Sequence, residues 1–291
     1  MNRRDFLRRS AGTMAGTLTL PGLAAGAAPG KPVAATVVTL GKTGIKTSLL
    51  GMGTGMHGWD HESDLTRKGP EVTRGVFQHA WDRGLRYFDL ADMYGSHKYM
   101  KELMHNGAKR EEAMILTKAH SRDPEIVRKD LDRFRQELDT DYVDIVLIHC
   151  LSDRDLPNWT EKLRPCMDVL AEAKEKGIIR AHGCSCHNLD TLKEAAACDW
   201  VEVMLSRINP FGAKMDGTPE EVVPVLKQAH AAGKGMLGMK IVGEGTLTDK
   251  IPESMKFVLG LGCIHAMTIG FLSIEEIDGA IAHLDAAAAE A

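Results

Sequence analysis

Four side chains that can hold or move a proton follow three consecutive apolar segments of this 291-residue chain. Asp89, Lys118 and His149 each stand near the end of a short apolar run, and Tyr94 follows Asp89 in the next loop. A tyrosine with its usual pKa near 10 is a weak acid at neutral pH, but an adjacent ammonium group favours the phenolate and lowers that value. We therefore expect Lys118 to lower the pKa of Tyr94, with Asp89 keeping Lys118 charged and in place.

Such a set suits the reduction of a carbonyl group. A hydride would arrive at carbon while Tyr94 gives its proton to the oxygen, and His149 would orient that oxygen through a hydrogen bond. Any one of these residues alone is more often structural. Only their convergence on one point would make a catalytic site.

That convergence requires strands whose carboxyl ends meet. Apolar segments alternate with amphipathic ones over about 240 residues without a linker, after a hairpin about the glycine turn Gly41-Lys-Thr-Gly44. Strands are expected at 49–54, 85–91, 114–118, 143–149, 178–185, 201–208, 236–242 and 266–270. Helices are expected at 70–83, 97–106, 123–138, 160–176, 188–198, 218–232, 250–260 and 273–288. This pattern predicts an α/β fold, a closed (β/α)8 TIM barrel, in which catalytic residues project from the strand ends. A doubly wound open sheet is the alternative, but Gly51-Met-Gly-Thr-Gly55 is not followed by the helix start that a phosphate loop needs.

Local signals predict where several helices begin. Asp123 is expected to cap the helix at 123–138, with Pro124 in its first turn. The apolar face of this helix is expected to comprise Ile126, Val127, Leu131, Phe134 and Leu138. Thr218-Pro-Glu-Glu221 and Ser273-Ile-Glu-Glu276 both match the capping box.

The first thirty residues are different in kind. Arg3-Arg4 and Phe6-Leu7 precede a mildly apolar run at 11–23 and small residues at 25–27. This layout is typical of a signal peptide, and the paired arginines resemble the twin-arginine (Tat) type, whose machinery exports folded proteins. We therefore assign residues 1–30 to a signal peptide and linker and expect an exported protein, periplasmic or secreted. A basic arm with a disordered linker is the alternative.

The net charge and composition of the chain argue against nucleic acid and membranes as binding partners. Removal of the signal would take four arginines and one aspartate from a chain whose formal net charge is already −4, so no basic stripe remains for nucleic acid. No other apolar run approaches the roughly 20 residues of a membrane helix, so no membrane anchor is expected in the mature protein. Six scattered cysteines are too few for a disulfide framework. We expect Cys150, Cys184 and Cys186 to pack in the core rather than to bind a metal or form a redox pair.

At these residues the chain resembles the aldo-keto reductase family. The stretches that carry the resemblance are Phe88–Gly95, Leu116–Lys118, Asp141–His149 and Gly177–Ser185. The hairpin before the first strand is similar to the family's cap on the barrel bottom, and the likeness runs from about residue 37 to 280. The resemblance implies one barrel domain, at 37–291, that uses NADPH or NADH to reduce an aldehyde or ketone or to oxidise the alcohol. It also implies Tyr94 as the general acid, tuned by Lys118 and Asp89. His149 would lie at the substrate oxygen.

The resemblance also implies a set of cofactor contacts, with some departures. The implied contacts are Thr54, Asp89, Ser185, Cys186, Lys240 and Gly270. Cys186 replaces the family's asparagine and Leu205 its glutamine, two residues that hold the nicotinamide. No Lys or Arg follows Gly270 to pair with the 2′-phosphate of NADPH, the family default, and Glu275 and Glu276 would repel that phosphate. Lys240 is expected to compensate by meeting the pyrophosphate.

Two other kinds of protein remain open at this point. One is a barrel that binds a nucleotide or a carbonyl ligand without turnover, as a sensor or interaction protein, and the departures at Cys186 and Leu205 favour it. The other is an isomerase or lyase on the same barrel. Three aromatic residues on loops are expected either to wall a substrate pocket or to cover the rim: Trp59, Trp159 and Phe211.

Overall fold

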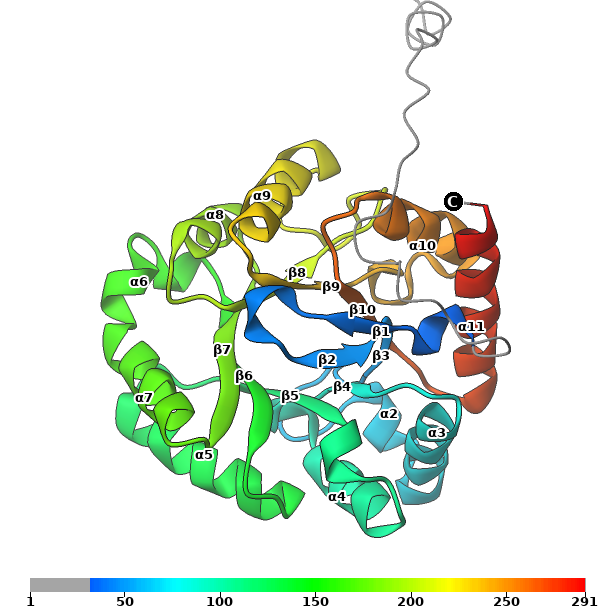
Figure 1. Ribbon diagram of the computed structural model, residues 1–291, viewed down its shortest axis with the longest axis horizontal. Coiled ribbons are helices and arrows are strands. Elements are labelled where there is room, and N and C mark those ends of the chain that lie inside the picture. The colour runs from blue at the N-terminus through cyan, green and yellow to red at the C-terminus, as the bar shows by residue number, and fades with distance from the viewer. Residues whose placement is uncertain (1–31, 291) are drawn as a thin grey trace, which may run out of the picture.

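Eight parallel strands close into a barrel in the computed structural model, which describes residues 32–290 (Figure 1). The strands are β3 (Leu50–Gly53), β4 (Tyr87–Asp89), β5 (Met114–Ala119), β6 (Val143–Leu151), β7 (Ile179–Cys186), β8 (Val203–Arg207), β9 (Gly235–Met239) and β10 (Ala266–Gly270). They pair in chain order, and β10 pairs with β3 to complete the ring. The predicted (β/α)8 barrel is confirmed, and the open sheet is excluded because that closing pair leaves no edge.

Helices surround the barrel, as the alternating pattern predicts (Figure 1). They are α2 (Asp64–Arg67), α3 (Pro70–Asp82), α4 (His97–His105), α5 (Pro124–Leu138), α6 (Trp159–Lys162), α7 (Arg164–Glu175), α8 (Leu189–Ala197), α9 (Pro219–Ala231), α10 (Ile251–Gly260) and α11 (Ile274–Ala289). The helix expected at 160–176 is two helices that meet at Leu163. Pro165 explains the break, because it has no N–H to continue the first helix but fits the first turn of a new one.

The predicted helix starts are mostly confirmed. The Asp123 side chain accepts a hydrogen bond from the Glu125 N–H at 2.8 Å, with Pro124 in the first turn of α5. The expectation for Ile126 is wrong, because its side chain is 47% exposed and Asp130 is buried on that helix instead.

The two predicted capping boxes have different outcomes. The box at Thr218 is complete, since the Glu221 carboxylate accepts a hydrogen bond from the Thr218 N–H at 2.9 Å. At Ser273 only half forms: the serine hydroxyl accepts from the Glu276 N–H, whereas the Glu276 carboxylate accepts from the N–H of Leu272. The Glu276 carboxylate therefore accepts from the residue before the N-cap instead of from the N-cap Ser273 itself.

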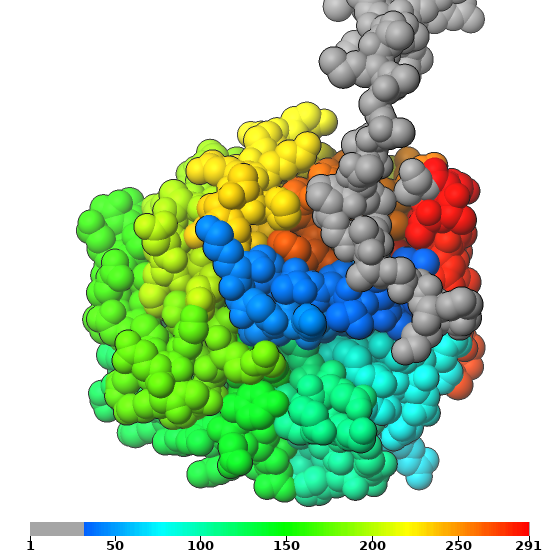
Figure 2. Space-filling view, viewed as in Figure 1, coloured from blue at the N-terminus to red at the C-terminus, as the bar shows by residue number. Residues whose placement is uncertain are grey.

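An antiparallel hairpin closes the amino-terminal end of the barrel, as expected. Strands β1 (Val37–Thr39) and β2 (Lys46–Ser48) lie across that end, and Figure 2 shows their residues in blue at the centre of this face. Leu40 and Ile45 are buried against the inner side chains of the barrel strands. The Lys42 N–H donates to the carbonyl of Gly233, just before β9, at 2.8 Å.

The barrel interior explains why polar groups gather at the opposite end. Its inner layer is apolar and includes Leu116, Ile145, Leu147, Leu205 and Leu237. A second apolar cluster lies between the strands and the helices. The charged residues Asp89 and Lys118 lie instead toward the carboxyl ends of their strands, where ligands can reach them.

The amino-terminal signal assignment, residues 1–30, lies outside the described residues. From residue 32 to residue 290 we find no helix with the length and apolar character needed to cross a membrane.

Candidate active site

The carboxyl ends of β4, β5 and β6 bring three of the predicted residues together. Lys118, only 1% exposed, donates from Nζ to Asp89 Oδ1 and, at 2.7 Å, to the carbonyl oxygen of Leu90. Asp89 and His149 are also buried. The ammonium is thus fixed between a carboxylate and a carbonyl, which a buried charge requires.

Tyr94 completes the set from a short 3₁₀ turn, η3 (Asp92–Tyr94). Its hydroxyl oxygen lies 3.2 Å from His149 Nε2, and the Lys118 Nζ atom is 4.8 Å from the centre of its ring. The structure therefore assembles all four residues at one point, although they come from four separate segments of the chain.

Three glycines make room for Tyr94, and sequence reasoning did not single them out. A Cβ added to Gly55 would lie 2.2 Å from the tyrosine ring, and one added to Gly58 would lie 2.4 Å from it. Gly95 has φ +63°, and a Cβ there would be 1.9 Å from the carbonyl oxygen of His61. The loop after β3 can therefore approach the Tyr94 ring and its turn this closely only because glycine stands at these three positions. The cluster of glycines after β3 was the available signal.

The pKa of Tyr94 is shifted in the opposite direction from the one that the sequence predicts. Burial, followed by the charge of Asp89, raises the pKa of Tyr94 well above 10. The expected lowering by Lys118 is therefore wrong for this structure, because burial disfavours the charged phenolate more than the neighbouring ammonium favours it. Burial and the Lys118 charge lower the pKa of His149 well below its usual 6.5. At neutral pH the site thus contains a protonated tyrosine beside an uncharged imidazole.

A cleft extends from Tyr94 over the ends of β5, β6 and β7. Beyond the four residues its lining includes His57, Trp59, His120, Cys150, Ser185 and His187. Trp59 is 65% exposed and its ring packs edge-on against His120, 6.1 Å between centroids. Trp59 therefore forms a wall of the cleft, one of the two roles expected for the three aromatic residues. Trp159 does not line the cleft, because it is buried beneath α8 and donates from Nε1 to the Thr191 carbonyl. Phe211 is exposed outside this lining.

A second groove meets this cleft at Tyr94 and runs over the ends of β9, β10 and β3. It is lined by Gly53, Gly55, Met56, Met239, Lys240, Ile241, Val242, Glu244, Gly245, Thr268, Ile269 and Gly270. Glycines at the strand ends let a ligand approach the backbone, and Gly270 has space above its Cα, since an added Cβ would meet nothing closer than 3.6 Å. An extended ligand with apolar rings and polar links fits this lining. Lys240 lies in the groove as expected, but its ammonium pairs with Glu244 at 2.5 Å.

Two of the implied cofactor contacts lie elsewhere. The Cys186 side chain is buried between the barrel and α8, with its sulfur 4.0 Å from that of Cys184, so it does not line the groove. Strand alternation is the reason, because Ser185 faces the cleft and its neighbours face away. Thr54 is also buried, and its hydroxyl donates to the Asp89 carbonyl at 2.9 Å. It ties β3 to β4 rather than facing the groove.

An arginine and a carboxylate that sequence reasoning missed lie next to these grooves. Arg207 follows Leu205 on the inner face of β8, and its Nη1 is 3.4 Å from Asp216 Oδ1. The Asp216 carboxylate is fully buried without a hydrogen bond, and burial raises its pKa to about 6. Burial and the charge of Arg207 lower the pKa of His187 to about 3. The alternation of β8 could have placed Arg207, but nothing local marks Asp216 as its partner.

Cys184 and Cys186 pack as small side chains in the outer core, as expected. The expectation is wrong for Cys150, which lines the cleft with its Sγ 3.4 Å from His187 Nε2. Within residues 32–290, no three His, Cys, Asp or Glu side chains are grouped as a metal site would require.

Comparison with known proteins agrees with this geometry. The model of the Aldo/keto reductase family matches residues 49–257. An aldo-keto reductase [NADP(+)] of Schizosaccharomyces pombe is 24% identical over 63% of this chain and 57% of its own length. A D/L-glyceraldehyde reductase of Hypocrea jecorina is 38% identical over 47% of this chain and 38% of its own length. These matches span less than two thirds of either relative.

Solved structures share the fold. A structure of an aldo-keto reductase from Pseudomonas aeruginosa superposes with a TM-score of 0.72 at 22% identity, covering 89% of this chain and 97% of the other. The holo form of an aldo-keto reductase from Bacillus halodurans gives a TM-score of 0.68 at 17% identity, covering 86% and 90%.

Proposed function

Because the chain belongs to the aldo/keto reductase family, we propose that it reduces an aldehyde or ketone with a nicotinamide cofactor, or runs the reverse oxidation of the alcohol. One observation carries this proposal. The Tyr94 hydroxyl and His149 Nε2 lie 3.2 Å apart, beside the buried Lys118–Asp89 pair, where the cleft and the groove meet.

The geometry gives each residue a role. A carbonyl oxygen bound at Tyr94 and His149 would accept hydrogen bonds from the phenol and from an Nε2–H of the neutral imidazole. As negative charge develops on that oxygen, its basicity rises far above that of the phenolate, so Tyr94 can give up its proton despite a raised pKa. Lys118 stabilises the phenolate that remains, because its ammonium is close to the ring.

The groove over β9, β10 and β3 fits the cofactor. Ser185, Lys240 and the backbone at Gly270 would hold it, and it supplies the hydride when bound. No Lys or Arg follows Gly270, and Glu275 and Glu276 occupy the first turn of α11, so we propose that NADH binds at least as well as NADPH.

The relatives suggest the kind of substrate. They include the glyceraldehyde reductase named above and an L-galactose dehydrogenase of Arabidopsis thaliana, 24% identical over 73% of this chain. The cleft supports small hydroxylated carbonyl compounds, because imidazoles from His57, His120 and His187 and the ring of Trp59 line it.

Absorbance at the nicotinamide band tests the proposal. NADPH and NADH are each offered with a panel of aldehydes, ketones and sugars to the wild type and to Tyr94→Phe. We expect turnover that falls about a thousandfold in the variant, as for loss of a general acid. Cofactor binding with no turnover on any substrate would instead favour a non-catalytic sensor. Turnover that survives in the variant would contradict Tyr94 as the acid.

We also propose that residues 1–30 export the folded protein through the twin-arginine machinery to the periplasm. The Arg3-Arg4 pair and the apolar run after it support this proposal. Replacing both arginines by lysine should leave the uncleaved protein in the cytoplasm on cell fractionation. Unchanged export of that variant would contradict it.

A further inference from the structure

The turn that carries Tyr94 has little to hold it by itself. It spans three residues, has one internal backbone hydrogen bond, from the Tyr94 N–H to the Ala91 carbonyl at 3.1 Å, and buries none of its residues fully. A 3₁₀ turn this short is marginal without outside contacts. The direction of the Tyr94 hydroxyl must therefore be set by neighbouring elements.

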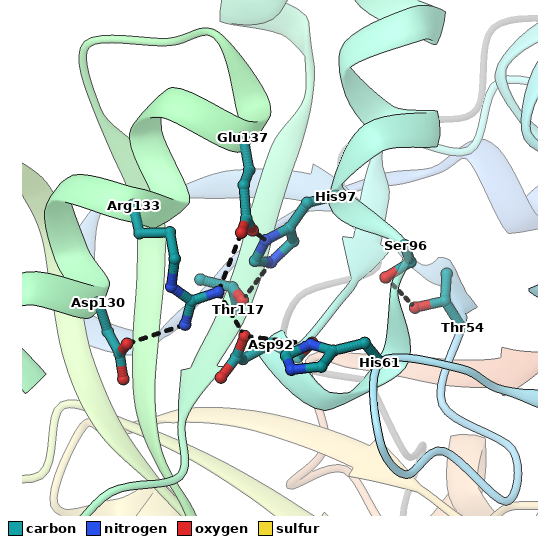
Figure 3. Close-up of polar contacts among 9 residues, drawn as sticks. All are labelled: Thr54, His61, Asp92, Ser96, His97, Thr117, Asp130, Arg133 and Glu137. Carbon is teal, nitrogen blue, oxygen red and sulfur yellow. Dashed lines mark hydrogen bonds and ion pairs between the residues drawn. The ribbon is translucent and has the colours of Figure 1, made fainter. Parts of the chain in front are cut away.

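Arg133 on α5 holds Asp92, the residue that begins the turn two positions before Tyr94 (Figure 3). Its Nη1 donates to Asp92 Oδ1 at 2.7 Å and to Glu137 Oε1 at 2.9 Å, and its Nη2 donates to Asp130 Oδ1 at 2.8 Å. Although burial opposes its charge, the hydrogen bonds that Arg133 donates to Asp92 and Asp130 raise the pKa of Arg133 above its usual value. One guanidinium thus holds three carboxylates, only one of which, Asp92, belongs to the turn.

The residues after the tyrosine are tied to the same cluster (Figure 3). The hydroxyl oxygens of Ser96 and Thr54 lie 2.9 Å apart, within hydrogen-bond distance. His97 pairs with Glu137 through Nδ1 at 2.6 Å and with Thr117 through Nε2 at 2.8 Å. Thr117 directly precedes Lys118 on β5, so the cluster joins the Tyr94 turn to the strand that carries the lysine.

We propose that Arg133 is a positioning residue, which fixes the Tyr94 hydroxyl against His149 and Lys118 by holding Asp92. This rests on the proposed function in that the effect on turnover requires Tyr94 to be the acid. Without Arg133, Asp130 would lose its ion-pair partner, Glu137 would keep only His97, and Asp92 would keep only the exposed His61, 3.6 Å away. The mutual repulsion of the three carboxylates would push Asp92, and the turn with it, away from α5.

Arg128 provides a matched control on the same helix. It also pairs with a glutamate of another element, Glu172 on α7, at 2.8 Å, but has no contact with the turn. Arg133→Met and Arg128→Met each remove one arginine and one ion pair to another element, and Arg133→Met also removes the pairs with Asp130 and Glu137 within α5. Asp92→Asn is a milder second variant, because the amide keeps the shape of Asp92 and removes its charge.

Fluorine NMR reads the position of Tyr94 without any turnover. The chain has four tyrosines, so 3-fluorotyrosine labelling gives a small set of signals, and the Tyr94 signal is identified by its loss in Tyr94→Phe. We expect Arg133→Met to shift or broaden the Tyr94 signal, Asp92→Asn to do so less, and Arg128→Met to leave it unchanged. An unmoved Tyr94 signal in both Arg133→Met and Asp92→Asn would overturn the proposal.

Kinetics give the second readout. Displacement of a catalytic group should lower kcat of Arg133→Met about tenfold with KM changed less than about twofold, while Arg128→Met stays near the wild type. In the Tyr94→Phe background Arg133→Met should cost little more, because the group that it positions is gone. An equal loss in both backgrounds would overturn the positioning role. If the wild type reduces no carbonyl at all, the proposed function fails, and the NMR result still decides whether Arg133 positions Tyr94.

Discussion

The two halves of the barrel mouth are built differently. Over β4 to β6, the ionisable groups are buried and already paired, with Lys118 fixed by Asp89 and Leu90 and Tyr94 beside His149. Over β7 to β10, the groups are partly open or incompletely paired: Lys240 and Glu244 are both about one fifth exposed.

The difference fits two kinds of task. A proton donor must have its geometry in place before the substrate arrives, because misplacement by a fraction of an ångström lowers the rate. A groove for a large ligand can leave hydrogen bonds to be completed by that ligand.

Replacing Lys118 in one half and Lys240 in the other should give the largest difference, measured as the free energy of unfolding. Lys118→Met leaves the Asp89 carboxylate buried and unpaired, so the free energy of unfolding should fall by about 3 kcal/mol. Lys240→Met breaks a partly exposed pair and should cost about 1 kcal/mol or less. Urea unfolding of both variants measures the difference. Equal losses would mean that the two halves are not built differently.

Two glycine-to-alanine replacements compare the space available for an added methyl group in the two halves of the barrel mouth. In Gly55→Ala the new methyl group would overlap the Tyr94 ring, so kcat should fall about tenfold or more. In Gly270→Ala the methyl group meets only ordinary contacts, so the fold should be unchanged and only cofactor affinity should weaken. Steady-state kinetics and cofactor titration separate the two effects. A Gly55→Ala enzyme with normal kcat would show that the tyrosine can move without penalty.

Asp216 offers a smaller effect with a defined pH dependence. Its pKa is raised to about 6, so the folded state holds a proton that the unfolded state releases near pH 4. Stability should therefore fall as pH rises from about 4 to about 6. Asp216→Asn should remove that fall and raise the free energy of unfolding at pH 7 by about 1–2 kcal/mol. If the free energies of unfolding of the variant and the wild type change in parallel with pH across this range, the raised pKa of Asp216 is contradicted.

The pH dependence of kcat should be the smallest effect. Tyr94 has a pKa raised above 10 and His149 a pKa lowered well below 6.5, so neither changes protonation between about pH 6.5 and 9. We expect kcat for carbonyl reduction to vary less than about twofold over that range, measured with saturating cofactor and substrate. A step near pH 7 would show that another group controls the reaction.

The sequence alone predicted the barrel and placed Asp89, Lys118 and His149 near the ends of its strands, with Tyr94 in the loop after Asp89. Hydrophobic periodicity and glycine turns are local, and a polar residue at the end of an apolar strand can be read without knowing what lies beside it. For this reason Asp89, Lys118 and His149 could be placed before any contact was known.

Only the tertiary structure decided how those residues are held and which neighbours take part. The Cys186 side chain faces the outer core because of the strand's alternation at its end, and Thr54 is bound to Asp89 instead of facing the groove. Arg133 lies 39 residues beyond Tyr94 on a helix that looks ordinary in sequence. The pKa of Tyr94 rises rather than falls because it depends on burial and on charges brought from other strands, and these distances exist only in the folded chain.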